Sequence, residues 1–244
     1  MDINAVSVSY KGQRESNEDA LDIQLNTKTK LFAIYDGHGG ANVSSYLKTE
    51  LPKHFINEDF PIKKPHIYKT FKTLQSNLIK RDSAVAEEMG STCLCTLINN
   101  NKLQIMNVGD CRAVIANSKK AIAITQDHKP NTKVERERIR NVKGNEKVYN
   151  DDGIWRIGPL SVSRSFGDTD TGKYISQTPD IFSYNISQKD DFIVLGCDGL
   201  WDVMKNSEVV KFVYDNPTNT ARKLGSEALK KGSSDNISII IVYF

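Results

Sequence analysis

Long apolar runs and a strong charge of either sign are both missing from this sequence of 244 residues. The most apolar stretch, Ile237 to Phe244, is far too short to cross a bilayer, and residues 1–19 lack the apolar core of a signal peptide. Lys and Arg number 33 against 30 Asp and Glu, and this net charge of +3 is too small and dispersed for a nucleic-acid-binding surface. We therefore expect an intracellular protein, cytoplasmic or nuclear, with neither membrane nor nucleic acid as a partner.

Cysteine is also scarce, and the spacing of the four cysteines excludes two kinds of site. No cysteine or histidine pair has the spacing of a zinc finger. A cysteine phosphatase needs an arginine six positions after its nucleophile, but Asn or Val occupies the position six residues after each cysteine. Three of the four lie in apolar strand-like runs, where a free cysteine behaves as a small hydrophobic residue. The cysteines are Cys93, Cys95, Cys111 and Cys197.

No linker rich in Pro, Gly or Ser divides the chain, so we expect one domain over residues 1–244. Short β-rich runs with turn sequences between them predict strands. Apolar spacing of three to four residues predicts helices within 41–51, 67–78, 207–214 and 220–230, and a charged helix within 133–142. Blocks of strands interrupted by helices indicate an α+β fold, with two antiparallel sheets packed together and helices outside them, a four-layer α-β-β-α sandwich. The predicted strands are 6–10, 31–35, 92–98, 103–108, 112–116, 121–125, 192–196 and 237–244.

Acidic residues recur where the apolar strand-like runs begin or end. The run 31-LFAIY-35 leads directly into Asp36, and Gly37 then permits a tight turn and close approach of a ligand to the main chain. Taken singly, each such acid is a turn residue or a helix cap, as in an ordinary Asp-Gly hairpin. The acids at these positions are Glu18, Asp19, Asp36, Asp110, Asp198 and Asp235.

Taken together, these acids predict a metal site. Several acids at strand ends, without an obvious basic partner, indicate oxygen ligands for a hard divalent cation such as Mg²⁺ or Mn²⁺. Converging carboxylates repel one another, and a bound cation would compensate their charge. Two such ions about 3.5 to 4 Å apart can activate a water for in-line attack on a phosphoryl group.

Eight short motifs, taken in order, resemble those of the metal-dependent protein phosphatases, the type 2C serine/threonine phosphatases, over nearly the whole chain. The motifs are Arg14 with Glu18-Asp19, 36-DGHGG-40, 90-GST-92, 109-GDCRA-113, 127-DHKP-130, 163-SRSFGD-168, 198-DGLWD-202 and 234-SDN-236. The resemblance implies a phosphoserine/phosphothreonine hydrolase acting on phosphoproteins as a monomer, in which a hydroxide that bridges two Mg²⁺ or Mn²⁺ ions attacks phosphorus.

The resemblance also implies a role for each site residue. Asp36 would bridge both ions, and Glu18 with the carbonyl of Gly37 would complete the first. Asp198 and Asp235 would bind the second ion, and Asp110 with Asp198 a weaker third. Arg14 matches the phosphate-binding arginine, and His38 the general acid that protonates the leaving oxygen. Asp19, Thr92, Asp202 and Asn236 would support the ligands from the outer shell.

Some alternatives stay open from the sequence. The chain could be a catalytically inactive binding module of the same fold, or a two-metal phosphoesterase acting on small phosphates. His128 could be a second acid, a ligand or a structural residue. Segments 57–65 and 201–234 look short for the family, and no extension follows Phe244, so substrate choice and regulation cannot be read from the sequence.

Overall fold

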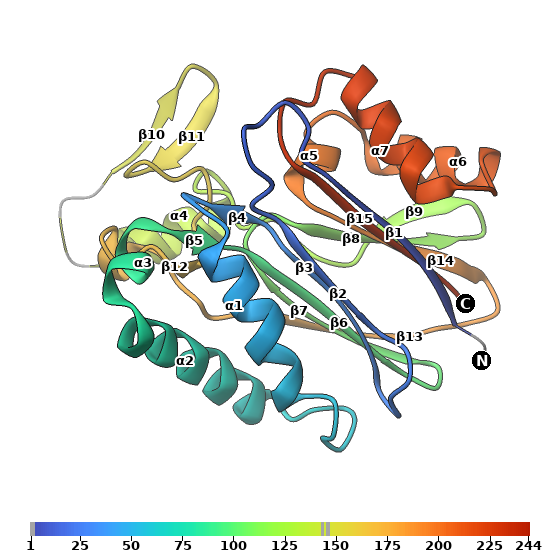
Figure 1. Cartoon of the computed structure of the whole chain (residues 1–244), viewed down its shortest axis with the longest axis horizontal. Coiled ribbons are helices and arrows are strands. Elements are labelled where there is room, and N and C mark those ends of the chain that lie inside the picture. Colours follow the sequence, from blue (N-terminus) through green and yellow to red (C-terminus); the bar gives the residue numbers. More distant parts are fainter. Residues whose placement is uncertain (1–2, 143, 145–146) are drawn as a thin grey trace.

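Two five-stranded antiparallel sheets form the centre of the protein, as the computed structural model shows for residues 3–142, 144 and 147–244 (Figure 1). The first sheet has the order β1 (Asn4–Tyr10), β15 (Ile237–Tyr243), β14 (Asp190–Gly196), β8 (Arg112–Asn117), β9 (Lys120–Ala123). The second has the order β13 (Asp180–Asn185), β7 (Lys102–Val108), β6 (Cys93–Asn99), β3 (Lys30–Tyr35), β2 (Ala20–Gln24). The chain passes from the second sheet to the first between β7 and β8.

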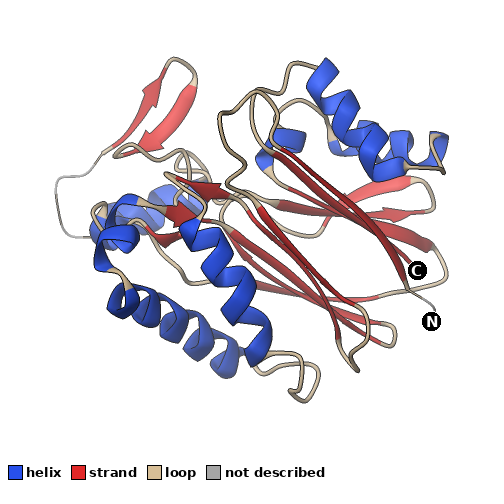
Figure 2. Ribbon diagram, in the orientation of Figure 1, coloured by secondary structure: helices blue, strands red, loops and turns tan. Residues whose placement is uncertain are grey.

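Helices cover the outer face of each sheet, which confirms the predicted four-layer α-β-β-α sandwich (Figure 2). The second sheet is covered by α1 (Asn42–Glu50), the 3-10 turn η1 (Leu51–His54), α2 (Lys64–Arg81) and α3 (Ser83–Glu88). The first sheet is covered by α5 (Asp198–Trp201), α6 (Asn206–Asp215) and α7 (Thr220–Lys230). The charged segment forms α4 (Lys133–Arg140), as predicted.

Smaller pieces of sheet complete the fold. A three-stranded sheet has the order β12 (Phe166–Gly167), β5 (Gly90–Ser91), β4 (Gly37–His38). A separate hairpin, β10 (Val148–Asp151) with β11 (Ile154–Ile157), projects from the layers (Figure 1). A second 3-10 turn, η2, spans Gly172–Tyr174. No helix in the described part of the chain is long and apolar enough to cross a membrane, and the intracellular location stays a prediction.

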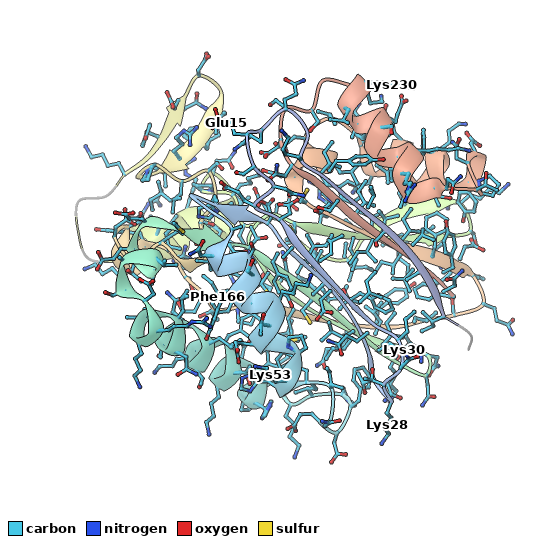
Figure 3. The ribbon with its side chains drawn as sticks, viewed as in Figure 1. Glu15, Lys28, Lys30, Lys53, Phe166 and Lys230 are labelled. Atoms are coloured by element: carbon cyan, nitrogen blue, oxygen red, sulfur yellow. The ribbon has the colours of Figure 1, made fainter. Side chains whose placement is uncertain are left out.

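The central strands are apolar on both faces because each sheet is covered twice. In β3, Phe32 and Ile34 point to the core between the sheets, whereas Leu31, Ala33 and Tyr35 point to the helices. Strand β15 divides its side chains in the same way. Because successive side chains of a strand alternate between its faces, a run with two buried faces must be apolar throughout. On the helix side of the second sheet, the ring of Phe166 packs against the ring of Phe71 of α2. Phe166 is labelled in Figure 3.

Strands β2, β10, β11 and β13 were not predicted. Strand β2, at the edge of its sheet, is half-buried and carries Asp22 and Gln24 among its apolar residues. Strand β13 is the opposite edge, and the hairpin is hydrogen-bonded to neither main sheet. Such strands bury little apolar surface, so the sequence carries no apolar run that marks them.

The two-sided burial makes a testable prediction about stability. Ile240 is fully buried between the sheets. The substitution Ile240→Ala should lower the free energy of unfolding by about 2–5 kcal/mol, because it leaves a cavity. The control is Ile122→Ala on edge strand β9, where the side chain is 40% exposed and the loss should stay below about 1 kcal/mol. Urea unfolding measures both; equal losses would contradict the layer assignment.

Candidate metal centre and active site

Acidic side chains from both sheets meet in one cleft of about 190 Å³. Asp36 follows β3, Asp110 lies between β7 and β8, Asp198 opens α5 after β14, and Asp235 precedes β15. All four line the cleft together with Arg14 and His38, two residues that the sequence placed in the active site. Their carboxylates come from distant parts of the chain, and the strand ends bring them together.

Asp36 is held in place through its backbone. Its N–H donates to Thr92 Oγ1 at 3.1 Å, and its carbonyl accepts from the Thr92 N–H at 2.9 Å. The next residues, Gly37 and His38, form β4 and pair with β5. The sequence predicted a strand, a tight turn and a helix here, and this order is found, with β4 inside the turn and α1 after it. Thr92 therefore supports the main chain of Asp36.

The carboxylates of Asp36, Asp110 and Asp198 form a group suited to a hard cation. One carboxylate oxygen of each lies within 4.8 Å of the others. An overlapping group joins Asp36 to Asp19 and the sulfur of Cys197. Burial, with the charges of Asp19 and Asp36, raises the pKa of the Cys197 thiol well above its usual value, and sulfur is a poor ligand for hard cations. The all-oxygen group is therefore the one that fits Mg²⁺ or Mn²⁺.

Burial and repulsion among the acids together raise the pKa values of the carboxylates in the cleft. Burial, then the charge of Asp198 and of other acids, holds the pKa of Asp36 well above its usual value. Burial and the charge of Asp110 do the same for Asp198, against a smaller opposing effect of Lys129. Burial raises the pKa of Asp19 to about 6, with the charge of Asp235 adding to the effect. A divalent cation among these groups would favour their ionised forms.

Two cations do lie beside these acids, which corrects the expectation that the acids have no basic partner. Lys129 Nζ lies 2.5 Å from Asp110 Oδ2 and 3.9 Å from Asp198 Oδ2. Arg14 Nη2 lies 2.7 Å from Asp235 Oδ2. Lys129 belongs to the 127-DHKP-130 motif, but only the folded chain brings it to Asp110. Lys129 and Arg14 thus neutralise part of the negative charge of the acids.

The backbone of Glu18 is held in place by two side chains, Asn236 and Ser44. Its N–H donates to Asn236 Oδ1 at 2.8 Å, and its carbonyl accepts from Ser44 Oγ at 2.5 Å. Its carboxylate accepts from Ser16 Oγ at 3.2 Å and belongs to neither carboxylate group found among the described residues. Asn236 also donates to the carbonyls of Lys11 and Ser16, so it fixes the loop that carries Glu18.

Asp202 lies at the end of α5, beside the same charges. Burial raises its pKa; the cation Lys129 opposes this shift, and the charge of Asp110 adds to it. Asp202 therefore belongs to the acidic cluster and lies near Lys129 and Asp110.

His38 has a partner to which the sequence gave no role. Its Nε2 lies 2.8 Å from Asp168 Oδ2 and 2.9 Å from Asp168 Oδ1. Burial lowers the pKa of His38, but the hydrogen bond and charge of Asp168 outweigh burial and raise it. Asp168 is itself buried and accepts a hydrogen bond from Ser165 Oγ. The only sequence signal was its place in the 163-SRSFGD-168 motif.

Gly90 allows this pair to form. A Cβ at residue 90 would lie 2.1 Å from Asp168 Oδ2 and 2.2 Å from His38 Nε2, far inside van der Waals contact. Asp168 adopts the left-handed backbone conformation, with φ of 50°, directly after β12. The small sheet of β12, β5 and β4 thus joins His38 to its partner across three segments of the chain.

Arg156 also lines the cleft, from the projecting hairpin. Its Nε donates to Asp151 Oδ2 at 3.1 Å, and its Nη1 donates to the Pro159 carbonyl at 2.7 Å. The sequence gave no signal for it, because the hairpin itself was not predicted.

His128 fits the structural alternative left open for it. The ring is 2% exposed, and its Nδ1 accepts from the Gly109 N–H at 3.0 Å. Its Nε2 lies 3.2 Å from Asp180 Oδ2. Both ring nitrogens are therefore engaged, and the first contact holds the backbone next to Asp110.

Comparison with known proteins agrees with this arrangement. A family profile described as protein phosphatase 2C matches residues 5–237. Probable protein phosphatase 2C 7 of Oryza sativa subsp. japonica is 36% identical over 245 residues, which cover 97% of this chain and 64% of that protein. Probable protein phosphatase 2C 69 of Arabidopsis thaliana is 37% identical over 245 residues, covering 97% of this chain and 68% of that protein. The chain thus spans about two-thirds of the length of these relatives.

Among solved structures, a C. elegans sex determining protein superposes with a TM-score of 0.90. The match covers 100% of this chain and 65% of that one at 22% identity, and at this identity it supports the fold alone.

The repulsion in the cleft predicts that metal stabilises the fold. Adding Mn²⁺ or Mg²⁺ should raise the melting temperature, by the equivalent of about 2.7 kcal/mol at roughly 100 times the dissociation constant. The control, Asp36→Asn, should be more stable than the unaltered protein without metal and gain little when metal is added, because one repelling charge is gone. Differential scanning calorimetry tests both; a melting temperature that neither cation changes would contradict the site.

Proposed function

This chain belongs to the protein phosphatase 2C family, and we propose that it is a divalent-metal-dependent protein serine/threonine phosphatase. The observation that carries the proposal is the group formed by Asp36, Asp110 and Asp198, with carboxylate oxygens within 4.8 Å of one another. The same cleft holds Arg14 and His38, a phosphate-binding type of side chain and a proton donor.

The proposed metal ligands come from five segments of the chain. Asp36, Asp198, Asp235, Glu18 and the carbonyl of Gly37 would hold two Mg²⁺ or Mn²⁺ ions, and Asp110 with Asp198 a weaker third. When bound, such ions neutralise charge on the phosphoryl group and activate a water as the nucleophile. Asp19, Thr92, Asp202 and Asn236 would keep the ligands oriented, a role supported by the backbone contacts of Thr92 and Asn236.

Arg14 would bind the phosphoryl group of the substrate. Its side chain is 56% exposed, and its contact with Asp235 is made by one nitrogen, Nη2. The other guanidinium N–H groups can donate to phosphoryl oxygens in the bidentate geometry that lysine cannot match. Asp235 would hold the guanidinium beside the metal centre.

His38 would protonate the leaving serine or threonine oxygen. Because Nε2 faces Asp168, the nitrogen left for substrate is Nδ1, which has no hydrogen-bond partner within the described residues. Asp168 would fix the ring orientation and favour the protonated imidazole. A seryl or threonyl oxygen is a poor leaving group, so a placed acid contributes about 10² to 10⁴ in rate.

Two other functions were open from the sequence, and the main proposal has more support than either. An inactive binding module would be expected to lack part of the ligand set, whereas every acidic position is filled here. A phosphoesterase for small phosphates shares the same chemistry, but the relatives named above carry the description probable protein phosphatase 2C. We also propose one catalytic domain, which the core shared by both sheets supports. The monomeric state stays a prediction.

The proposal predicts Mn²⁺- or Mg²⁺-dependent release of phosphate from phosphoserine and phosphothreonine peptides, with much less from phosphotyrosine peptides. Excess EDTA should abolish release. Asp198→Asn should lower kcat by at least about 100-fold, because outer-shell residues alone are worth about 10- to 100-fold. A malachite-green phosphate assay measures each rate.

Three outcomes would refute this function. Metal binding by calorimetry without turnover of any phosphopeptide or aryl phosphate would favour the binding module. Faster hydrolysis of mononucleotides than of phosphopeptides would favour the small-phosphate enzyme. Full activity in excess EDTA would remove the metal from the reaction.

Changing the leaving group tests the acid role of His38. His38→Gln should lose at least roughly tenfold more rate on a phosphothreonine peptide than on p-nitrophenyl phosphate, since phenolate leaves without a proton. Asp168→Asn should show the same bias, because it loosens the His38 ring without touching the metal ligands. Both rates are measured at saturating Mn²⁺.

Equal losses on the two substrates would mean that His38 braces the turn around Gly37 and not the leaving group. Asp36→Asn provides the comparison, because damage to the metal centre should lower both rates together.

A further inference from the structure

Helix α2 carries only positive charge. Its eighteen residues, KPHIYKTFKTLQSNLIKR, include no Asp or Glu, although the whole chain has nearly equal numbers of acids and bases. All of the lysines and the arginine are exposed to solvent. They are Lys64, Lys69, Lys72, Lys80 and Arg81.

Three of the cations, Lys69, Lys72 and Lys80, lie on the side of α2 away from its buried face. Ile67, Phe71 and Leu78 face the core under the second sheet. At 100° per residue, Lys69 and Lys80 lie opposite this buried face, Tyr68 and Lys72 lie at one edge of the solvent-exposed outer face, and Lys64 lies in the first turn. Helix α2 lies on the outside of the sandwich (Figure 1). At 1.5 Å per residue its eighteen residues span about 27 Å, so the charges are spread along it as a stripe.

The stripe lacks compensating acids. Among the described residues, Lys64, Lys69, Lys72 and Lys80 form no ion pair, whereas Lys53 of the neighbouring turn pairs with Glu50. Lys69 and Lys72, three residues apart, repel each other at a cost of about 0.2–0.5 kcal/mol, whereas Lys80 and Arg81 in the last turn interact favourably with the helix dipole.

An apolar element accompanies the charge. Tyr68 is 42% exposed and Ile79 is 40% exposed, both on the outer face. A hollow of about 300 Å³ is lined by Tyr68, Phe71 and Lys72 of α2 together with Gln177 and Thr178. The hollow is large enough for a side chain of a bound partner.

We propose that the outer face of α2 docks an acidic segment of the protein substrate, an inference that rests on the proposed phosphatase function. Asp and Glu side chains of such a segment would pair with the lysines, and an apolar side chain would enter the hollow beside Tyr68. Complementary charge at an exposed surface mainly speeds and orients association.

The chemistry of the face favours a polypeptide over a membrane or a nucleic acid. Membrane insertion requires a free apolar face, but that of α2 is buried in the core, and only Tyr68 and Ile79 are exposed. Single-stranded nucleic acid binds to a series of aromatic side chains, and this face has one.

α2 is also fixed to the active site. Gln75 Nε2 donates to the Gly167 carbonyl at 3.1 Å, and the Gly167 N–H donates back to Gln75 Oε1 at 3.0 Å. Gly167 precedes Asp168, the partner of His38. A segment bound on α2 would therefore tether its phosphorylated residue near a rigidly placed cleft, which raises the effective concentration of that residue.

The experiment compares two phosphothreonine peptides with the same phosphosite. One ends there, and the other continues through a Gly/Ser linker into an acidic tail that contains one Leu. We expect the tailed peptide to have a KM about tenfold lower at low salt with the same kcat, because docking adds ground-state binding. The quadruple variant Lys64→Glu, Lys69→Glu, Lys72→Glu, Lys80→Glu should lose this advantage and leave the short peptide unchanged.

A matched variant reverses four exposed lysines elsewhere and should retain the advantage: Lys28→Glu, Lys102→Glu, Lys120→Glu and Lys189→Glu. Lys28 lies at the edge of the molecule in Figure 3. Turnover of p-nitrophenyl phosphate and the melting temperature check folding. If the α2 reversal variant does not fold, the Gln variant at the same four positions should lose about half of the advantage on a logarithmic scale.

The outcomes separate the docking surface from the catalytic function. No turnover of either peptide by the unaltered protein would refute the proposed function. Turnover of both with equal KM, or equal loss in the two reversal variants, would overturn the docking surface alone. Loss of binding to phosphatidylserine vesicles or to single-stranded RNA in the α2 variant, with the peptide advantage unchanged, would also overturn it.

Discussion

Mutual repulsion among carboxylates at the ends of the strands is the constraint on which the active site depends. Asp36, Asp110 and Asp198 lie within reach of one cation. Burial and the charges of neighbouring acids hold the pKa values of Asp36 and Asp198 well above their usual range, and Lys129 pairs with Asp110. No folded chain would bring these groups together for stability alone, because converging buried charges cost free energy. We therefore infer that these carboxylates converge because together they bind a cation.

The contacts around the cluster act on the backbone more than on the carboxylates. Thr92 holds the main chain of Asp36, Asn236 holds that of Glu18, and His128 holds that of Gly109. Such contacts fix the backbone position of each acid. Asp110 and Asp235 each also pair with one cation, Lys129 or Arg14, whereas the carboxylate of Asp168 accepts hydrogen bonds from two neutral or ring donors, Ser165 and His38. This difference is consistent with the distinct roles proposed for the two kinds of acid.

Much of the fold could be predicted because its central strands are buried on both faces. The apolar run Ile237–Tyr243 can only be stable when both of its faces are buried. The acids next to such runs could therefore be predicted as site residues from their position at the strand ends. Strands β2 and β13 carry mixed side chains at sheet edges and give no such signal. Lys129 and Asp168 escaped prediction for another reason: each acts through one contact with a distant residue, and a contact of this kind has no periodicity in the sequence.

The crossing of the chain between β7 and β8 gives the cleft a mechanical property. Asp36 is anchored to one sheet and Asp198 to the other, while Asp110 lies in one of the segments that join the two sheets. The separation of the acids is therefore set by how the sheets lie on each other, and the apolar layer between them acts as the spacer. Protein interiors are packed too densely for the sheets to slide freely. A substitution that changes the volume of that layer, far from any acid, would therefore change the distances between the carboxylates that form the cation site.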